Sequence, residues 1–293
     1  MKELLKKIRI SANYSQVAIA DELGVTFATI NRWENGHTMP NRLAQEKIYD
    51  FCVKHSIPLY DFILQKILTL VKTIDVDGNR IVLYHGSKSG LEGKIEPKSR
   101  DKCDFGRGFY MGTEPGQPLT LICDFPKPEF YIVSVDIKDL KSIEIPDDIE
   151  WAMLVAYHRG RMEGIKGTQL YQKYEKHFSD KDLAIGSIAN DRMFYVIDNF
   201  FQGLITDQAL VNSLSTLQSG KQYVMLTQKG CDKVKIETKV ELSWLERKCL
   251  QAVSGENRIK GINMANKICK DYRREGKFFD EILGQTSKGG ELI

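Results

Sequence analysis

The sequence lacks the patterns that mark four common classes of protein. No run of about eighteen consecutive apolar residues is present that could span a bilayer. The six cysteines show no C-x-x-C spacing and the five histidines show no i, i+4 pair, so neither a disulfide framework nor a metal site is expected. The N-terminus has no long apolar core of a signal peptide. We therefore expect a soluble, cytoplasmic protein without membrane contact and without a metal.

Two common nucleotide-binding patterns are missing as well. There is no Walker A string, and Gly106-x-Gly108 has no glycine or alanine at Met111 and does not lead from a strand into a helix. The net charge is also small, at +3 in 293 residues, and by itself it does not indicate a nucleic-acid-binding protein. The remaining composition, 42% hydrophobic and 28% charged, fits a globular chain with one large or two small domains.

Residues 1–73 carry apolar side chains at helical spacing, which predicts five helices. We expect the first over roughly 2–11, the fourth from 41 onward and the fifth around 60–71. Ser15 and Thr26 are N-cap residues for the second and third helices, Gly24 supplies the turn between them, and Gly36 stands at a helix-stop position. The polar stretch 73–80, with its Asp77-Gly78 turn, predicts a domain joint.

Within this first unit, the string SQVAIADELGVTFATINRWENG resembles the helix-turn-helix of the phage-repressor (Xre-like) family. Ala20 is small where two helices cross, and Ile30 and Trp33 would pack the recognition helix down. The resemblance implies sequence-specific DNA binding. The residues expected at the DNA are Gln16, Phe27, Ala28, Asn31 and Arg32.

Base readout would depend on the polar members of this set. Phe27 and Ala28 can touch thymine methyl groups but cannot make bidentate hydrogen bonds, whereas Arg32, Asn31 and Gln16 can bond to bases or phosphates. The small positive charge of residues 1–73 predicts weak binding by one copy, so a homodimer on two half-sites is expected. The alternative is an ordinary five-helix bundle that serves dimerisation.

From Ile81 onward the pattern changes to strands, turns and a few helices, and residues 241–293 return to helix. The clearest feature lies between LYHGS, which ends at Ser87, and GRGFYMGT, which contains Tyr110. His85 and Tyr110 stand at strand edges next to glycines, which let a backbone approach a ligand closely. We therefore expect the two rings to sandwich a flat heterocycle. The plainer alternative is a locally bonded histidine and a core tyrosine.

This pairing resembles the ADP-ribosyltransferase superfamily of the poly(ADP-ribose) polymerase and diphtheria-toxin kind. His85-Gly86-Ser87 matches its first motif, and Gly106-Arg107-Gly108-Phe109-Tyr110 matches its Gly-Lys-Gly-Ile-Tyr-like second motif, with Arg for Lys and Phe for Ile. The stretches DLAIGSIANDRMF and GKQYVMLTQKG look like an uncharacterised bacterial family within it, whose members often sit in toxin–antitoxin-like gene pairs. The resemblance covers roughly residues 80–240.

The resemblance implies NAD as substrate and a role for each matched residue. His85 would hold the adenosine-side ribose, Gly86 would bind the carboxamide through its backbone, Ser87 would support it, and Tyr110 would stack on the nicotinamide. The third role is normally filled by a glutamate on a later strand. Gln222 is the best-placed residue, but it can accept a hydrogen bond without supplying a charge.

Two carboxylates, Asp191 and Glu237, are the alternatives for this third role. Arg159, Arg161 and Lys166 could contact a phosphate-rich ligand, although a solvated charged face is the plainer interpretation of that cluster.

These observations predict an α+β protein in three parts. A five-helix helix-turn-helix domain (1–73) precedes a mixed ADP-ribosyltransferase-like domain with a split antiparallel sheet (80–240) and a helical extension (241–293). One functional hypothesis is a mono-ADP-ribosyltransferase or NAD glycohydrolase coupled to DNA binding, with a possible antitoxin partner in a toxin–antitoxin or phage-defence setting. The other is a transcriptional regulator whose second domain is a non-catalytic nucleotide sensor.

Overall fold

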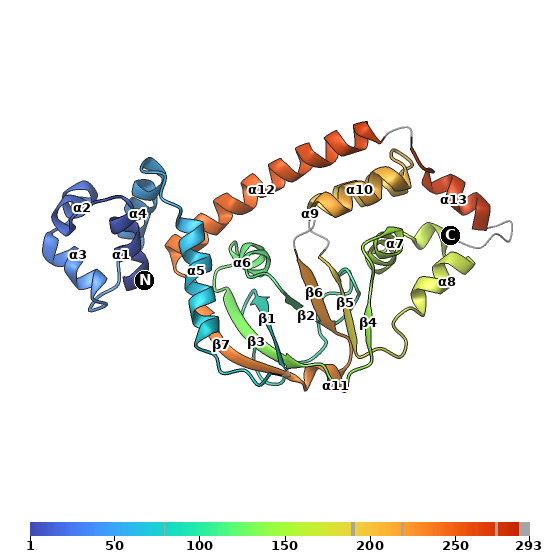
Figure 1. The fold of residues 1–293 in the computed structure, drawn as a ribbon, viewed down its shortest axis with the longest axis horizontal. Coiled ribbons are helices and arrows are strands. Elements are labelled where there is room, and N and C mark those ends of the chain that lie inside the picture. The colour runs from blue at the N-terminus through green and yellow to red at the C-terminus, as the bar shows by residue number, and fades with distance from the viewer. Residues whose placement is uncertain (79, 189–190, 218–219, 273–274, 287–293) are drawn as a thin grey trace.

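The computed structural model describes residues 1–78, 80–188, 191–217, 220–272 and 275–286 (Figure 1). The first unit consists of five helices, as the sequence predicts: α1 (Lys2–Ser11), α2 (Gln16–Leu23), α3 (Phe27–Glu34), α4 (Arg42–Lys54) and α5 (Leu59–Lys72). Ser15 and Thr26 cap α2 and α3 through their hydroxyl oxygens, and Gly24 ends α2 with a φ of 63°. The local signals therefore fixed these boundaries correctly.

A seven-stranded sheet follows, in the order β4-β5-β6-β2-β1-β3-β7. All pairs are antiparallel except β4 with β5. The strands are β1 (Arg80–Ser87), β2 (Phe109–Gly112), β3 (Glu129–Asp136), β4 (Ser142–Glu144), β5 (Leu183–Ser187), β6 (Lys221–Met225) and β7 (Val234–Glu241). The fold is thus α+β with a mixed sheet.

The sheet is weakest at its centre. β1 and β2 pair only at Tyr84 with Gly112, whereas β1 pairs with β3 along its whole length. The sheet is therefore continuous but nearly divided into the halves β4-β5-β6-β2 and β1-β3-β7. His85 lies just beyond the single pairing position, so the candidate site of the second unit lies at this division.

Helices cover one face of the sheet (Figure 1). They are α6 (Gly116–Ile122), α7 (Ile149–His158), α8 (Gln169–Glu175), α9 (Asp191–Phe201) and α10 (Asp207–Leu217), with a short 3-10 turn at Glu163–Ile165. Two apolar clusters lie on this face, one under α7 and α9 and one under α6. The opposite face has a smaller cluster under the segment with Leu91 and Ile95, next to α11 (Gln228–Cys231).

The long helix α12 (Trp244–Asp271) runs from the helix-turn-helix unit across the molecule to α10, and α13 (Phe279–Thr286) follows it (Figure 1). Its start is fixed by a capping box between Ser243 and Glu246. Lys66 on α5 donates to the buried Glu246 at 2.7 Å, and Gln45 on α4 accepts from the Leu245 backbone at 2.9 Å. α12 is thus bonded to the first unit at its N-terminal end.

One apolar cluster crosses the expected joint at 73–80. Buried residues of α5, such as Ile63 and Ile67, pack in the same cluster as Leu119 of α6, Phe130 of β3 and Leu250 of α12. α5 is therefore both the last helix of the first unit and part of the core that covers the sheet. None of the helices in the described part of the chain is long and apolar enough to cross a membrane.

Candidate functional site

The first candidate surface is the exposed side of α3. Phe27 is 50% exposed, Ala28 and Arg32 are exposed, and Asn31 is partly exposed. Ile30 and Trp33 are buried against α1 and α2, as the spacing predicts. α3 therefore presents a mixed apolar and basic surface of the kind that enters a major groove.

Gln16, which the sequence places at the DNA, is held by other side chains of this unit. Its side-chain nitrogen donates to Glu34 at 2.7 Å, and Glu34 also accepts from Arg9 at 2.7 Å. Because Glu34 is buried in this ion pair, it holds Gln16 against the end of α3. In this structure Gln16 joins α1, α2 and α3 rather than standing free for a phosphate.

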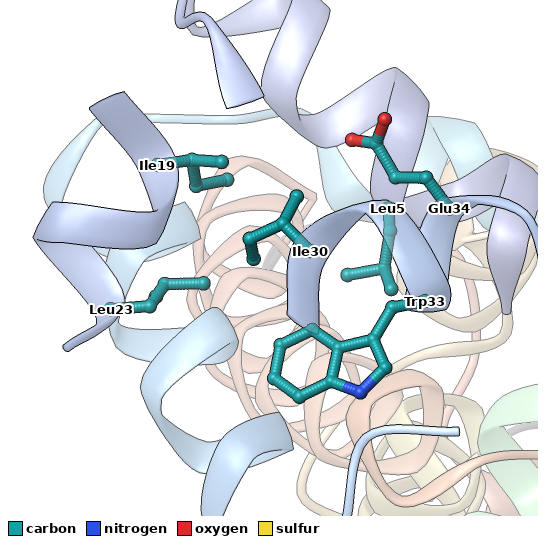
Figure 2. A pocket seen from close by; sticks show the side chains of 6 residues that line it. All are labelled: Leu5, Ile19, Leu23, Ile30, Trp33 and Glu34. Carbon is teal, nitrogen blue, oxygen red and sulfur yellow. The ribbon is translucent and has the colours of Figure 1, made fainter. Parts of the chain in front are cut away.

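A small pocket lies inside this unit (Figure 2). Its volume of about 10 Å³ is room for one water molecule at most. The pocket is lined by Leu5, Ile19, Leu23, Ile30, Trp33 and Glu34. It is a packing gap between α1, α2 and α3 and not a ligand site.

The second candidate site begins at His85 on β1. Its Nδ1 lies 2.7 Å from the Tyr110 backbone oxygen, and its ring stacks on Phe109 with centroids 4.4 Å apart. Burial lowers the pKa of His85, so the imidazole is neutral near pH 7. Nδ1 must then carry the proton donated to the carbonyl. No partner of Nε2 is present among the residues that the structure describes, so this nitrogen is available as an acceptor.

The expected sandwich of His85 and Tyr110 does not form. His85 is opposite Tyr131 in register and shares the face of the sheet with Phe109, while Tyr110 alternates to the helical face. The Tyr110 hydroxyl donates to Gly106 O at 2.7 Å and accepts from the Phe105 backbone at 3.0 Å. Burial raises the pKa of this hydroxyl. Tyr110 therefore fixes the loop before β2, and its ring does not face the His85 ring.

The motif glycines have a packing role. A Cβ on Gly86 would meet Pro118 O and Ile122 Cγ2 of α6 at 2.8 Å each, and a Cβ on Gly108 would overlap Val224 on β6. Only glycine lets α6 approach β1 this closely at Gly86 and lets β6 approach the chain this closely at Gly108. The Ser87 hydroxyl donates to Gly90 O at 2.7 Å and so closes the turn after β1.

Gln222 is the second residue of β6 and is 5% exposed. It is opposite Gly112 on β2 and Gly186 on β5, on the same face as Tyr110. Its Nε2 donates to Asp104 Oδ2 at 3.0 Å and to Ser187 O at 2.9 Å. Gln222 is therefore part of a buried polar cluster between the sheet and α7.

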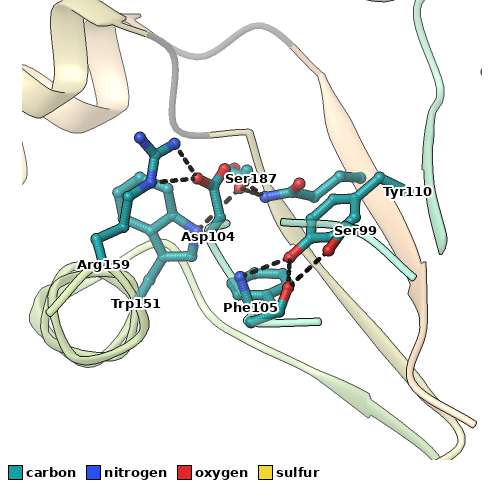
Figure 3. Close-up of polar contacts among 9 residues, drawn as sticks. Ser99, Asp104, Phe105, Tyr110, Trp151, Arg159 and Ser187 are labelled. Carbon is teal, nitrogen blue, oxygen red and sulfur yellow. Dashed lines mark hydrogen bonds and ion pairs between the residues drawn. The ribbon is translucent and has the colours of Figure 1, made fainter. Parts of the chain in front are cut away.

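Arg159, at the end of α7, completes this cluster (Figure 3). Its Nε donates to Asp104 Oδ1 at 3.1 Å, and the two side chains form an ion pair. The Trp151 indole donates to Ser187 O at 3.0 Å, and the Ser187 hydroxyl donates to Asp147. Asp104 is 5% exposed, so its carboxylate is held by donors in a largely dry environment.

The other residues considered from sequence lie elsewhere. Glu237 is on β7, separated from β6 by β2, β1 and β3, and accepts from Ser134 and from Lys235. The side chain of Asp191 lies outside the described residues. Arg161 pairs with Asp198 and Lys166 is exposed, so Arg159, Arg161 and Lys166 do not form one phosphate-binding cluster.

Asp104 was missed by sequence reasoning. It lies in DKCDFGRGFY, four residues before Gly108, where nothing in the spacing distinguishes it from the neighbouring acidic residue Asp101. Its contact with Gln222 joins positions 118 residues apart, which local pattern cannot reveal. No group of three potential metal-binding side chains is present among the residues searched, which are the described ones.

Comparison with known families gives two matches. Residues 5–43 match a helix-turn-helix model, so the first unit is a helix-turn-helix module of the DNA-binding kind. Residues 81–236 match a family described as "Protein of unknown function (DUF3990)". No curated protein and no solved structure matches the chain.

Proposed function

We propose that this chain, which belongs to the DUF3990 family, is an NAD-dependent mono-ADP-ribosyltransferase or NAD glycohydrolase coupled to a sequence-specific DNA-binding module. The first two motifs, at His85 and Tyr110, resemble those of ADP-ribosyltransferases. The proposal concerns the second unit, and the helix-turn-helix match supports only the DNA-binding part.

The single observation that carries the proposal is the position of three residues distant in sequence. His85, Tyr110 and Gln222 lie on β1, β2 and β6, which are neighbours in the sheet. The nearly divided junction of β1 and β2 passes between the first two. His85 faces the side of the sheet opposite to Tyr110 and Gln222, so we propose that the ligand passes through the division, with the first motif on one half and the other two on the second half.

The cleavage of NAD requires a separate role from each of these residues. Cleaving the nicotinamide–ribose bond builds positive charge on the sugar, and nicotinamide leaves with the bonding electron pair. His85 Nε2 would accept a hydrogen bond from the adenosine-side ribose. Gly86 is paired with Phe130 of β3, but beyond Tyr84 the side of β1 that faces β2 has no pairing in the described part of the chain, and we propose that this side, next to Gly86, receives the carboxamide. Gln222 would accept a hydrogen bond from the nicotinamide ribose, where the cation develops.

Tyr110 needs a separate account, because its hydroxyl is already bonded within the loop. Only the ring remains for the ligand. We therefore propose that it stacks on nicotinamide from the helical face, while the hydroxyl keeps the Phe105–Gly108 loop closed. Without this stacking, the protein would bind both the NAD ground state and the transition state more weakly.

The test is release of free nicotinamide from NAD by the full chain. Wild type should release it steadily. His85→Ala and Tyr110→Ala should lower kcat/KM, with Tyr110→Ala also raising KM. Arg32→Ala is the matched control, since its side chain is on the exposed side of α3 and should leave the rate unchanged. The ADP-ribose product, free or attached to protein or nucleic acid, then separates hydrolysis from transfer.

A second candidate function is supported by one specific feature. Gln222 is uncharged, and α6 packs on the first motif at Gly86 while its Gly116 lies against Tyr60 of α5. A nucleotide bound at the second unit could therefore act on the helix-turn-helix without being cleaved. This regulator would bind NAD or a related nucleotide and release no nicotinamide, whereas the enzyme releases it.

The assembly is also part of the proposal. A homodimer would place two α3 helices on two half-sites, which compensates for the small charge of one module. An antitoxin-like partner is a further proposal, and it would be identified by co-purification with the full chain.

A further inference from the structure

The side-chain amide of Gln222 has only one orientation compatible with its neighbours. Both hydrogen-bonding contacts, Asp104 Oδ2 at 3.0 Å and Ser187 O at 2.9 Å, are to acceptors. A glutamine amide has two N–H donors and one oxygen. Turning the amide over would place Oε1 against a carboxylate and a carbonyl, so both donors are committed and the oxygen is left over.

The two acceptors are themselves fixed. The Asp104 carboxylate pairs with Arg159 through its other oxygen, and Ser187 O also accepts from the Trp151 indole. No donor to Gln222 Oε1 is present in the described part of the chain. Gln222 therefore presents a preorganised acceptor at the start of β6, on the face that Tyr110 shares.

We propose that Asp104 is a positioning residue for Gln222, and that the two together do the work of one glutamate. Asp104 holds the amide so that Oε1 accepts from the nicotinamide ribose. This inference rests on the proposed NAD chemistry and identifies the carboxylate that the third motif lacks. Because Nε2 donates to an anion, the amide is polarised and Oε1 gains negative charge, which stabilises the sugar cation.

Exchanging the two functional groups gives a sharp test. In Asp104→Asn, one amide oxygen must serve both Arg159 and Gln222, so the new amide nitrogen faces a donor. In Gln222→Glu, two carboxylates meet where Nε2 and Oδ2 are 3.0 Å apart, and they repel each other when both are ionised. In the double variant, the amide introduced at position 104 can accept from Arg159 and donate to the carboxylate introduced at position 222, whose second oxygen faces the ribose. Ser187 O keeps its bond from Trp151, but its 2.9 Å contact with position 222 becomes an oxygen–oxygen contact, so we expect the recovery to stop short of wild type.

The measurement is kcat for nicotinamide release at saturating NAD by wild type, both single variants and the double variant. We expect each single variant to lose about tenfold to a hundredfold at neutral pH, because one preorganised contact is misplaced. The double variant should recover to within about tenfold of wild type. KM should change little in all four, since the contact acts on the transition state.

The pH profile of Gln222→Glu is a second and independent readout. With one shared proton, the protonated carboxyl introduced at position 222 donates to Asp104 and its carbonyl oxygen remains an acceptor, as in wild type. As pH rises and this proton is lost, the pair repels and activity should fall. Among the residues that the structure describes, the other ionisable groups around the pair are Arg159, Asp147, Tyr110, Cys103 and His158, and all are unchanged in every variant. Wild type and the double variant should therefore show no such fall in the same range.

The outcomes separate the inference from the proposed function. If wild type releases nicotinamide but the two substitutions combine multiplicatively, and Gln222→Glu has the wild-type pH profile, Asp104 is only a partner of Arg159 and the inference is wrong. If wild type releases no nicotinamide, the proposed function fails and the inference falls with it. Thermal unfolding of all four proteins identifies any loss that comes from misfolding, and the pH profile of Gln222→Glu does not depend on altering Asp104.

Discussion

Gln222 illustrates how one residue can be both buried and available. Its donors are used inside the protein and its oxygen is not. Gln222→Ala removes that oxygen, and we expect kcat for nicotinamide release to fall about a hundredfold, with KM nearly unchanged. Gln228→Ala is the matched control, because Gln228 bonds to Ile95 O away from the cluster. Equal rates for the two variants would remove Gln222 from the site.

Asp182 should influence the stability of the second unit in acid. Hydrogen bonds from Lys229 and Thr227 lower its pKa to about 2. A depressed carboxyl pKa contributes stability above the unfolded value of about 4, and this contribution is lost as pH falls towards 2. The free energy of unfolding of wild type should therefore decrease over that interval. Asp182→Asn should reduce the decrease; an identical acid limb in denaturant titrations would contradict this assignment.

At the scale of elements, α6 is positioned by a glycine on β1. Gly86→Ala would place a Cβ 2.8 Å from Pro118 O and Ile122 Cγ2, so α6 must shift. We expect a loss of about 1–3 kcal/mol in the free energy of unfolding, as for other overpacked sites. Gly164→Ala is the control, since nothing lies within 4 Å of a Cβ there. Urea unfolding of both variants checks this, and equal midpoints would show that α6 yields without cost.

The elements that sequence predicted well are those whose signals are local. Ser15, Thr26 and Gly24 fix the ends of α2 and α3 through bonds within four residues, so the helix-turn-helix could be predicted from one short string. The side-chain faces of β1 and β2 were not, because they depend on the single pairing of Tyr84 with Gly112. That register separates the His85 and Tyr110 rings, which the glycine-flanked motifs alone had suggested would meet.

The candidate site was predictable only in part for the same reason. Gln222 was found because it lies near the start of a strand in a motif-like context. Asp104 and Arg159 could not be found, since their meeting requires the loop before β2, the end of α7 and the start of β6 to converge. Contacts over such separations are set by tertiary packing, which no local window contains.

At the scale of the whole molecule, the two units that carry the candidate sites share one apolar cluster at their junction. α5 packs with α6 and α12, and Lys66 pairs with the buried Glu246. The polar stretch predicts a domain boundary at 73–80, and this boundary stays a prediction. The apolar cluster contains residues from both sides of it. α12 then extends along the helical face to α10, linking the helix-turn-helix unit to the distant end of the sheet (Figure 1).

Arg32→Ala tests whether the DNA surface can be altered alone. Arg32 is exposed on α3, so its loss should leave the fold and NAD turnover intact. Specific DNA affinity should fall by about 1–3 kcal/mol if Arg32 reads a guanine, and by less if it meets only phosphate. Gel shifts at fixed salt measure this, with Arg107→Ala in the second unit as the control. Unchanged operator binding by Arg32→Ala would count against α3 as the reading helix.

The central claim is that β1, β2 and β6 together bind NAD. The most direct measurement is a crystal structure of the full chain with a non-cleavable NAD analogue. We expect the analogue across the division between β1 and β2, with a nicotinamide-ribose hydroxyl within hydrogen-bonding distance, about 2.6–3.2 Å, of Gln222 Oε1. Gln222 Nε2 should remain bonded to Asp104. An analogue bound elsewhere, or a ribose that faces Asp191 with Gln222 turned away, would contradict NAD binding by these three strands.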